Sequence, residues 1–209
     1  MIDTRYIAAF SPLKERLCLD FTNTSDEHPS KPTAELLTSY ARLVEWSVFS
    51  DCISQEQGET LLTLARQHPD KAEKALDFAI TVRETLFRVL AAAAADRQPE
   101  AADMQAFNGI VAKAMSHLHL TSSPTHFSWT CALDESDLET MVWPVIWSAA
   151  ELMTSHDLHY LRECASEDCE WLFLDTSKNH SRRWCSMKEC GNRSKARSHY
   201  QRARKPNEN

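Results

Sequence analysis

Four cysteines near the carboxy-terminal end of this 209-residue chain limit what it can fold into more than any other feature. They form two pairs of equal spacing, Cys164-x4-Cys169 and Cys185-x4-Cys190, with fifteen residues between the pairs. Two short-spaced pairs joined by a hairpin-length insert can aim four sulfurs at one point, as a tetrahedral thiolate zinc site requires. We therefore predict a closed, structural Zn2+ site held by these four cysteines.

Buried or redox-active free thiols are the alternative that the spacing leaves open. Four thiolate ligands leave no open coordination position, which disfavours hydrolysis at the metal. Zinc binding would instead supply the folding free energy of a small module. The remaining cysteines, Cys18, Cys52 and Cys131, lie singly at apolar positions, and we expect them to be small core residues.

The residues around the two pairs predict a treble-clef-like finger. Residues 171–174 are apolar and predict a strand, and residues 182–184 predict a return strand leading into Cys185. Residues 191–205 lack proline and are rich in Lys, Arg, Ala and Gln, which favours a helix. Such a finger has four parts in this order: a turn that carries the first cysteine pair, a hairpin, a turn that carries the second pair, and a helix. We call each cysteine-bearing turn a knuckle.

The rest of the chain has mainly helical periodicity, so we expect a mainly α (α+β) fold. Ser54 and Gln57 form a capping box that opens a helix ending before Pro69. We expect one helix to begin near residue 34, a long helix to end near Arg97, and another to begin at Pro99–Glu100. A further helical segment spans residues 134–155, and Pro144 should kink it or mark a new helix start.

In three segments, apolar and polar residues alternate instead. Residues 17–21 predict a short strand, and residues 117–120 and 127–131 predict a β-hairpin with leucines and aromatic residues on its buried face.

Composition excludes several classes of protein. The three glycines lie far apart, so the chain has no glycine-rich phosphate loop, dinucleotide fingerprint or G-x-S-x-G elbow. Charges interrupt residues 1–20 and no apolar run could span a bilayer, so we expect a cytoplasmic protein without membrane contact. We predict no catalytic residues and no enzyme; the enzymatic alternative would place Asp20 and Asn23 in a pocket of the helical domain.

The net charge of −7 hides an uneven distribution. Residues 1–177 carry a net charge of −15, whereas residues 178–205 hold ten Lys or Arg against Glu189 alone. A basic block of this density favours a polyanion as partner, and we predict nucleic-acid contacts from seven side chains: Arg182, Arg183, Arg193, Lys195, Arg197, Arg202 and Arg204. The alternative is a basic helix docked on the acidic amino-terminal part.

Several motifs together resemble a known family. Residues 173–177 (FLDTS), 182–187 (RRWCSM) and 190–195 (CGNRSK) look like the CGNR zinc finger, although Lys178 stands where arginine is common. Residues 17–24 (LCLDFTNT) resemble the opening of the ABATE domain that precedes this finger. The resemblance covers essentially the whole chain.

The resemblance implies a stress-responsive bacterial transcription regulator whose finger binds DNA, with Cys164, Cys169, Cys185 and Cys190 as zinc ligands. We expect an ABATE-like helical domain over residues 1–158 for sensing or dimerisation, the finger over 159–205 and a tail over 206–209. The expected partners are DNA, a second copy of the chain, and a small-molecule or protein effector at the helical domain. A finger that binds protein but no DNA is the alternative function.

Overall fold

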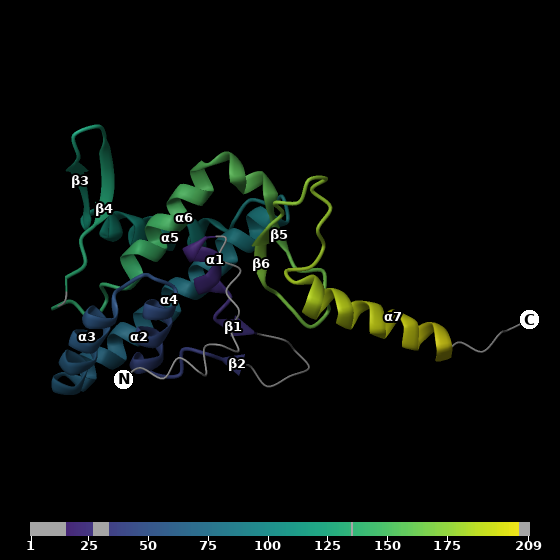
Figure 1. The fold of residues 1–209 in the computed structure, drawn as a ribbon, viewed down its shortest axis with the longest axis horizontal. Coiled ribbons are helices and arrows are strands. Elements are labelled where there is room, and N and C mark those ends of the chain that lie inside the picture. Colours follow the sequence, from purple (N-terminus) through teal and green to yellow (C-terminus); the bar gives the residue numbers. More distant parts are fainter. Residues whose placement is uncertain (1–15, 27–33, 135, 205–209) are drawn as a thin grey trace, which may run out of the picture.

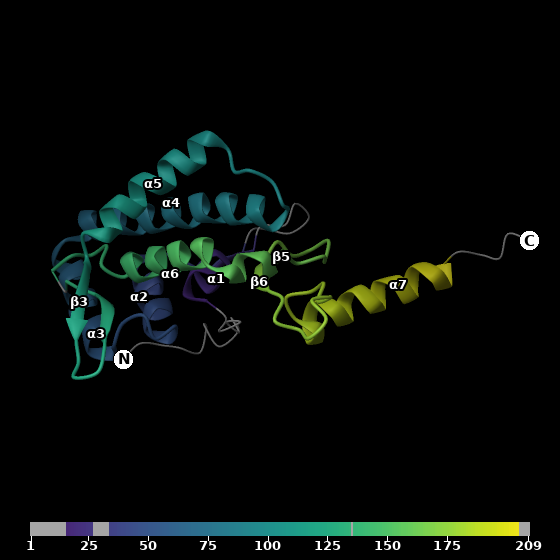
Figure 2. The same ribbon diagram turned by 90° about the horizontal axis from the view of Figure 1, so that it is seen from above.

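The computed structural model describes residues 16–26, 34–134 and 136–204, except the side chains of residues 26, 34, 198, 199 and 201–204. Most of the described chain is a bundle of α-helices around α4, Pro69–Ala94, which contacts every other helix of the bundle (Figures 1 and 2). The others are α1 (Leu17–Thr22), α2 (Tyr40–Phe49), α3 (Gln55–Gln67), α5 (Ala101–Met115) and α6 (Val142–Thr154). The predicted mainly helical class is confirmed.

Helix boundaries follow the local signals in the sequence. The Ser54 hydroxyl accepts a hydrogen bond from the Gln57 backbone N–H at 3.1 Å, and the Gln57 side chain accepts one from Ser54 N–H at 2.8 Å. This capping box opens α3, as predicted. Pro69 is the first residue of α4, and Pro144 lies in the first turn of α6, where a missing N–H has little cost.

The strand predicted at residues 17–21 is wrong, because these residues form α1. Cys18, Leu19, Phe21 and their neighbours up to Thr22 are all buried, between α4 and α6. A short helix enclosed on every side shows no 3.6-residue apolar period, so its sequence cannot be told from a buried strand. Of the three cysteines predicted in the core, Cys18 is buried, whereas Cys52 and Cys131 are half-buried. Burial raises the pKa of the Cys18 thiol to about 11.

The helix expected from residue 34 begins later, at Tyr40, with Ser39 as its N-cap. Residues 34–35 form strand β2 (Ala34–Glu35), which pairs antiparallel with β1 (Ser25–Asp26). Leu36 and Leu37, two apolar residues that the helical pattern included, lie between β2 and α2 and belong to neither element.

Glu35 of β2 is held in place by Arg83 of α4. The Arg83 side chain is only 3% exposed, and its guanidinium donates to both Glu35 carboxylate oxygens, at 2.8 and 2.6 Å. Glu84 and the Thr24 hydroxyl accept the remaining bonds. Burial opposes the ionised form of Glu35, but the hydrogen bonds and charge of Arg83 outweigh it and lower the pKa of Glu35. This ion pair fastens β2 to the central helix.

The predicted hairpin is present as β3 (Leu118–Ser122) and β4 (Phe127–Cys131), but its predicted burial is wrong. The hairpin projects from the bundle (Figures 1 and 2), and the aromatic side chains of β4 are exposed. Phe127 is 76% exposed and Trp129 is 55% exposed.

The carboxy-terminal part begins with the 3-10 helix η2 (His156–Tyr160) and strand β5 (Leu161–Glu163). Strand β6 (Leu172–Leu174) pairs antiparallel with β5, so the return strand predicted at residues 182–184 is wrong. A π-helical turn, η3 (Met187–Gly191), then leads into the predicted helix, α7 (Asn192–Arg204).

Strand β6 faces two cores. Leu172 and Leu174 join the core of the helical bundle, whereas Phe173 lies with the four cysteines of the finger. Beyond the cysteines, α7 extends away from the bundle (Figures 1 and 2).

We expect Glu35→Gln to lower the free energy of unfolding by about 2 kcal/mol at pH 7, because it leaves buried Arg83 short of a counter-charge. Because the folded state lowers the pKa of Glu35, its stabilisation is present above the unfolded pKa and is lost as the pH falls below about 4. Urea titrations of the wild type and the variant at pH 7 and at about pH 3 test this, with Glu73→Gln at an exposed position as the control. An undiminished difference at about pH 3 would contradict the assignment.

Candidate metal centre and nucleic-acid interface

The four predicted metal ligands converge on one point. Their sulfur atoms all lie within 4.8 Å of one another, and all four residues are buried. The Sγ atom of Cys185 is 3.7 Å from that of Cys169 and 3.6 Å from that of Cys190. Zn–S bonds of about 2.3 Å would place tetrahedral sulfurs about 3.8 Å apart, whereas a disulfide requires about 2.05 Å. The spacing therefore fits a metal ion held by four thiolates.

Electrostatics within the cluster also favour a cation. Hydrogen bonds from neighbouring thiols lower the pKa of Cys164, and the same bonds raise the pKa values of Cys169 and Cys185. Crowded sulfurs cannot all become thiolates unless a positive charge lies among them. A divalent ion bound here would supply that charge and would hold the two knuckles together as a structural site.

The backbone shapes both knuckles around the sulfurs. Cys164 N–H donates to the Trp171 carbonyl at 2.9 Å, and Cys169 N–H donates to the Ser166 carbonyl at 3.1 Å, which closes the first turn. Cys185 N–H points at the Cys164 sulfur, 3.5 Å away. The second pair ends in η3, whose last residues begin the CGNR segment.

Each residue of the CGNR segment, 190–193, supports the metal centre. A Cβ atom on Gly191 would lie 2.5 Å from Sδ of Met187, so a side chain there would have to displace that methionine. The Asn192 amide donates to the Lys188 carbonyl at 2.9 Å, and Nη2 of Arg193 donates to the Cys190 sulfur at 3.0 Å. This hydrogen bond raises the pKa of Arg193.

Asp175 organises the loop before the second pair, a role that the sequence analysis missed. Its carboxylate is fully buried and accepts bonds from the Ser177 backbone N–H at 3.0 Å, the Ser177 hydroxyl at 2.5 Å and Arg182 N–H at 2.9 Å. Burial opposes its charge, but these donors lower the pKa of Asp175 overall. The Asp-x-Ser pattern, which favours a local turn, is the signal that could have identified it.

Arg182 points into the finger. Its guanidinium lies 4.5 Å from the centre of the Phe173 ring and donates to the carbonyls of Trp184 at 3.0 Å, Leu174 at 3.2 Å and Cys185. These carbonyls are thus hydrogen-bonded by an arginine side chain, where a return strand would have used backbone N–H groups.

Arg197 lies on α7 but reaches back to the first knuckle, where it forms ion pairs with Glu167, at 2.6 Å, and with Asp168. Together with Arg193 on Cys190, it fixes the direction in which α7 leaves the finger.

Other predicted cations face solvent. Arg183 and Lys195 are exposed, and neither forms an ion pair with any residue that the structure describes. Arg202 and Arg204 lie in the last turns of α7, but their side chains fall outside the described part of the chain. Because α7 extends away from the acidic bundle, this basic helix does not lie along it (Figures 1 and 2).

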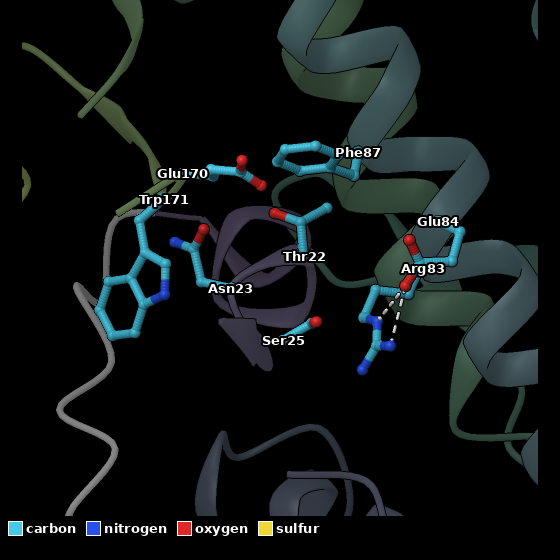
Figure 3. A pocket seen from close by; sticks show the side chains of 8 residues that line it. All are labelled: Thr22, Asn23, Ser25, Arg83, Glu84, Phe87, Glu170 and Trp171. Carbon is cyan, nitrogen blue, oxygen red and sulfur yellow. Dashed lines mark hydrogen bonds and ion pairs between the residues drawn. The ribbon is translucent and has the colours of Figure 1, made fainter. Parts of the chain in front are cut away.

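Asn23 joins the two parts of the molecule. Its side-chain amide donates to the Leu172 carbonyl at 2.9 Å and accepts from Leu172 N–H at 3.0 Å. Figure 3 shows Asn23 beside Trp171 and Glu170 of the finger, with Phe87 and Arg83 of α4 on the other side of a small pocket. The cavity of about 20 Å³ holds roughly one water molecule, so it does not fit an organic effector.

The other residue of the enzymatic alternative, Asp20, is buried within α1 and does not line this pocket.

Two known protein families match the chain, one over the helical bundle and one over the finger. The CGNR zinc finger family matches residues 160–203, and the ABATE family, described as "Putative stress-induced transcription regulator", matches residues 15–156. No curated protein matches the chain. Together with the cysteine geometry, the zinc finger match fits a structural Zn2+. Among the described helices, none is long and apolar enough to cross a membrane.

We expect the purified protein to contain about one zinc ion per chain and Cys185→Ser to lose it, because three thiolates cannot close the tetrahedron. Cys131→Ser is the matched control, since that thiol lies outside the cluster. Metal analysis by mass spectrometry measures both. Retention of the full metal content by Cys185→Ser would contradict the assigned ligands.

Neighbouring arginines provide a second test. Arg182→Ala should release zinc to a chelator at least about tenfold faster, because three carbonyls and the Phe173 ring lose their cation. Arg183→Ala removes the same charge from the surface and should release zinc at the wild-type rate. Chelator competition followed by a zinc dye measures both rates; equal rates would refute the inward role of Arg182.

Proposed function

Because the chain belongs to the ABATE family and carries a CGNR zinc finger at its carboxy-terminal end, we propose that it is a transcription regulator that binds DNA through this zinc-stabilised module. The observation that carries the proposal is the placement of α7, a cationic helix anchored at the metal centre and projecting from an acidic body (Figures 1 and 2).

The charge distribution favours one mode of approach. The bundle belongs to the part of the chain with net charge −15, so DNA is repelled along most of the surface and attracted at the finger. The 13 residues of α7 span about 20 Å, enough to cross a major groove or follow a phosphate track. We infer that the end bearing α7 meets the duplex first.

The geometry supports two roles for the seven predicted cations. Arg182, Arg193 and Arg197 hold the finger and the root of α7, so they act as positioning residues in this proposal. The phosphate contacts then come from the exposed or distal cations Arg183, Lys195, Arg202 and Arg204. Arg183 and Lys195 form no ion pair with any described residue, so they have none to break and bind phosphate at lower cost.

We propose the domain division at residues 158 and 159, with the helical domain in a sensing or dimerising role and residues 206–209 as a tail. Strand β6 and Asn23 would transmit a change in the helical domain to the finger, because both join the two parts directly. A stress signal acting on either part would then alter the direction of α7.

The alternative function is a finger that binds an acidic protein and no DNA. The same exposed cations would serve it. Failure of the zinc-loaded, folded protein to bind DNA even at low salt would favour this alternative.

We expect the wild-type protein to bind genomic DNA fragments with a salt slope of about −4, corresponding to four phosphate contacts. Lys195→Ala should weaken binding and reduce the slope by about 0.9, because one counterion fewer is released. Fluorescence anisotropy over a salt series measures both. Lys74→Ala on the exposed face of α4 is the matched control; an equal loss in both variants would contradict a finger-specific contact.

A further inference from the structure

The β3–β4 hairpin has one apolar and one polar face. The register pairs Leu120 with Trp129, and Phe127 follows on the same face. These side chains are 60%, 55% and 76% exposed. On the opposite face, the Thr121 hydroxyl bonds to Ser128 and Thr130, so the polar side satisfies itself while the apolar side stays open.

The apolar face continues onto the bundle. The Trp129 ring centre lies 6.1 Å from that of Trp147 on α6, and Met115 at the end of α5 is 48% exposed. An apolar hollow between α5 and α6 lies at the hairpin base, lined in part by Met115 and Trp147. We call Met115, Leu120, Phe127, Trp129 and Trp147 the hairpin patch.

All residues of the hairpin patch except Trp147 lie in one uncharged stretch of an acidic protein. Residues 114–133, twenty in all, contain no Asp, Glu, Lys or Arg. Exposed edge strands ordinarily carry such charges to prevent pairing with another chain, and this hairpin has none. Since residues 1–177 otherwise carry a net charge of −15, this stretch is where two copies can approach with least repulsion.

The hairpin patch is also large enough to form the apolar core of a dimer interface. At 48% to 76% exposure, Met115, Leu120, Phe127 and Trp129 present on the order of 400 Å² of surface. Two copies would bury about twice that amount, and a standard interface of about 1,600 Å² has a fully buried core that is about 65% apolar. The hairpin patch alone thus supplies most of the apolar core that a stable homodimer needs.

We propose that two copies of the chain associate through their hairpin patches, each packing on the other about a twofold axis. A self-contact needs only one surface that complements itself, and an uncharged apolar face gives no repulsion between identical copies. The absence of Lys and Arg from residues 114–133 disfavours a nucleic acid or an anionic lipid surface as the occupant.

This association rests on the dimerising role proposed for the helical domain and names its surface, but it does not depend on DNA binding. The hairpin lies at the opposite end of the molecule from α7 (Figures 1 and 2), so both copies would keep α7 exposed.

The first experiment is sedimentation velocity of the zinc-loaded full chain, without DNA, over about 1–100 μM, where interfaces of this size can dissociate. We expect a dimer whose dissociation constant rises at least about tenfold in Phe127→Ser/Trp129→Ser. Tyr200→Ser, which removes a 61% exposed aromatic from α7, should associate like the wild type. A monomeric wild type, or equal association of all three proteins, would overturn the proposal.

A second experiment covers the case in which the double variant misfolds. A photoreactive phenylalanine at position 127 preserves the aromatic side chain and should crosslink to residues 111–147 of a second copy. Raising the salt concentration should not reduce this product, because the contact is apolar. Crosslinks that map to α7, or a product that disappears with salt, would refute the hairpin patch as the interface.

Discussion

The rest of the structure depends on the alternation of a three-residue strand. Successive residues of β6 point to opposite sides, so Leu172 and Leu174 pack into the helical bundle while Phe173 packs against the cysteine cluster. Asn23 clamps the same strand through both hydrogen bonds to Leu172. The metal centre is therefore joined to the bundle by shared packing rather than by a linker.

The arginines show why charge alone is an incomplete guide to binding. Arg182 donates hydrogen bonds to carbonyls beside the second knuckle, and Arg197 forms ion pairs with the acidic residues of the first knuckle. Both contribute to the basic composition of residues 178–205, yet their geometry supports the finger. Guanidinium suits this work because its planar fork can satisfy several acceptors and stack on an aromatic ring. The cations left for a polyanion are those that the fold does not occupy.

Local chemistry made much of the fold predictable. The Ser54 capping box, the prolines at helix starts and the spacing of the four cysteines each act through near neighbours, and the structure contains them as expected. Tertiary context decided the rest. Residues 18–22 of α1 are all buried, which removes the period that separates helix from strand. Strand β6 pairs with β5, and where a return strand was expected the Arg182 side chain donates to the Leu174 carbonyl.

The exposed hairpin shows how sequence and structure constrain each other. Alternation at residues 117–131 correctly predicted two strands with one apolar face, and the inference that this face must be buried rests on sound physics. The described fold leaves the tip of that face open, with Phe127 the most exposed large apolar side chain among the described residues. Burial within one copy and burial between copies satisfy the same hydrophobic demand. A pattern in one chain predicts that a face is covered, but it does not identify what covers it.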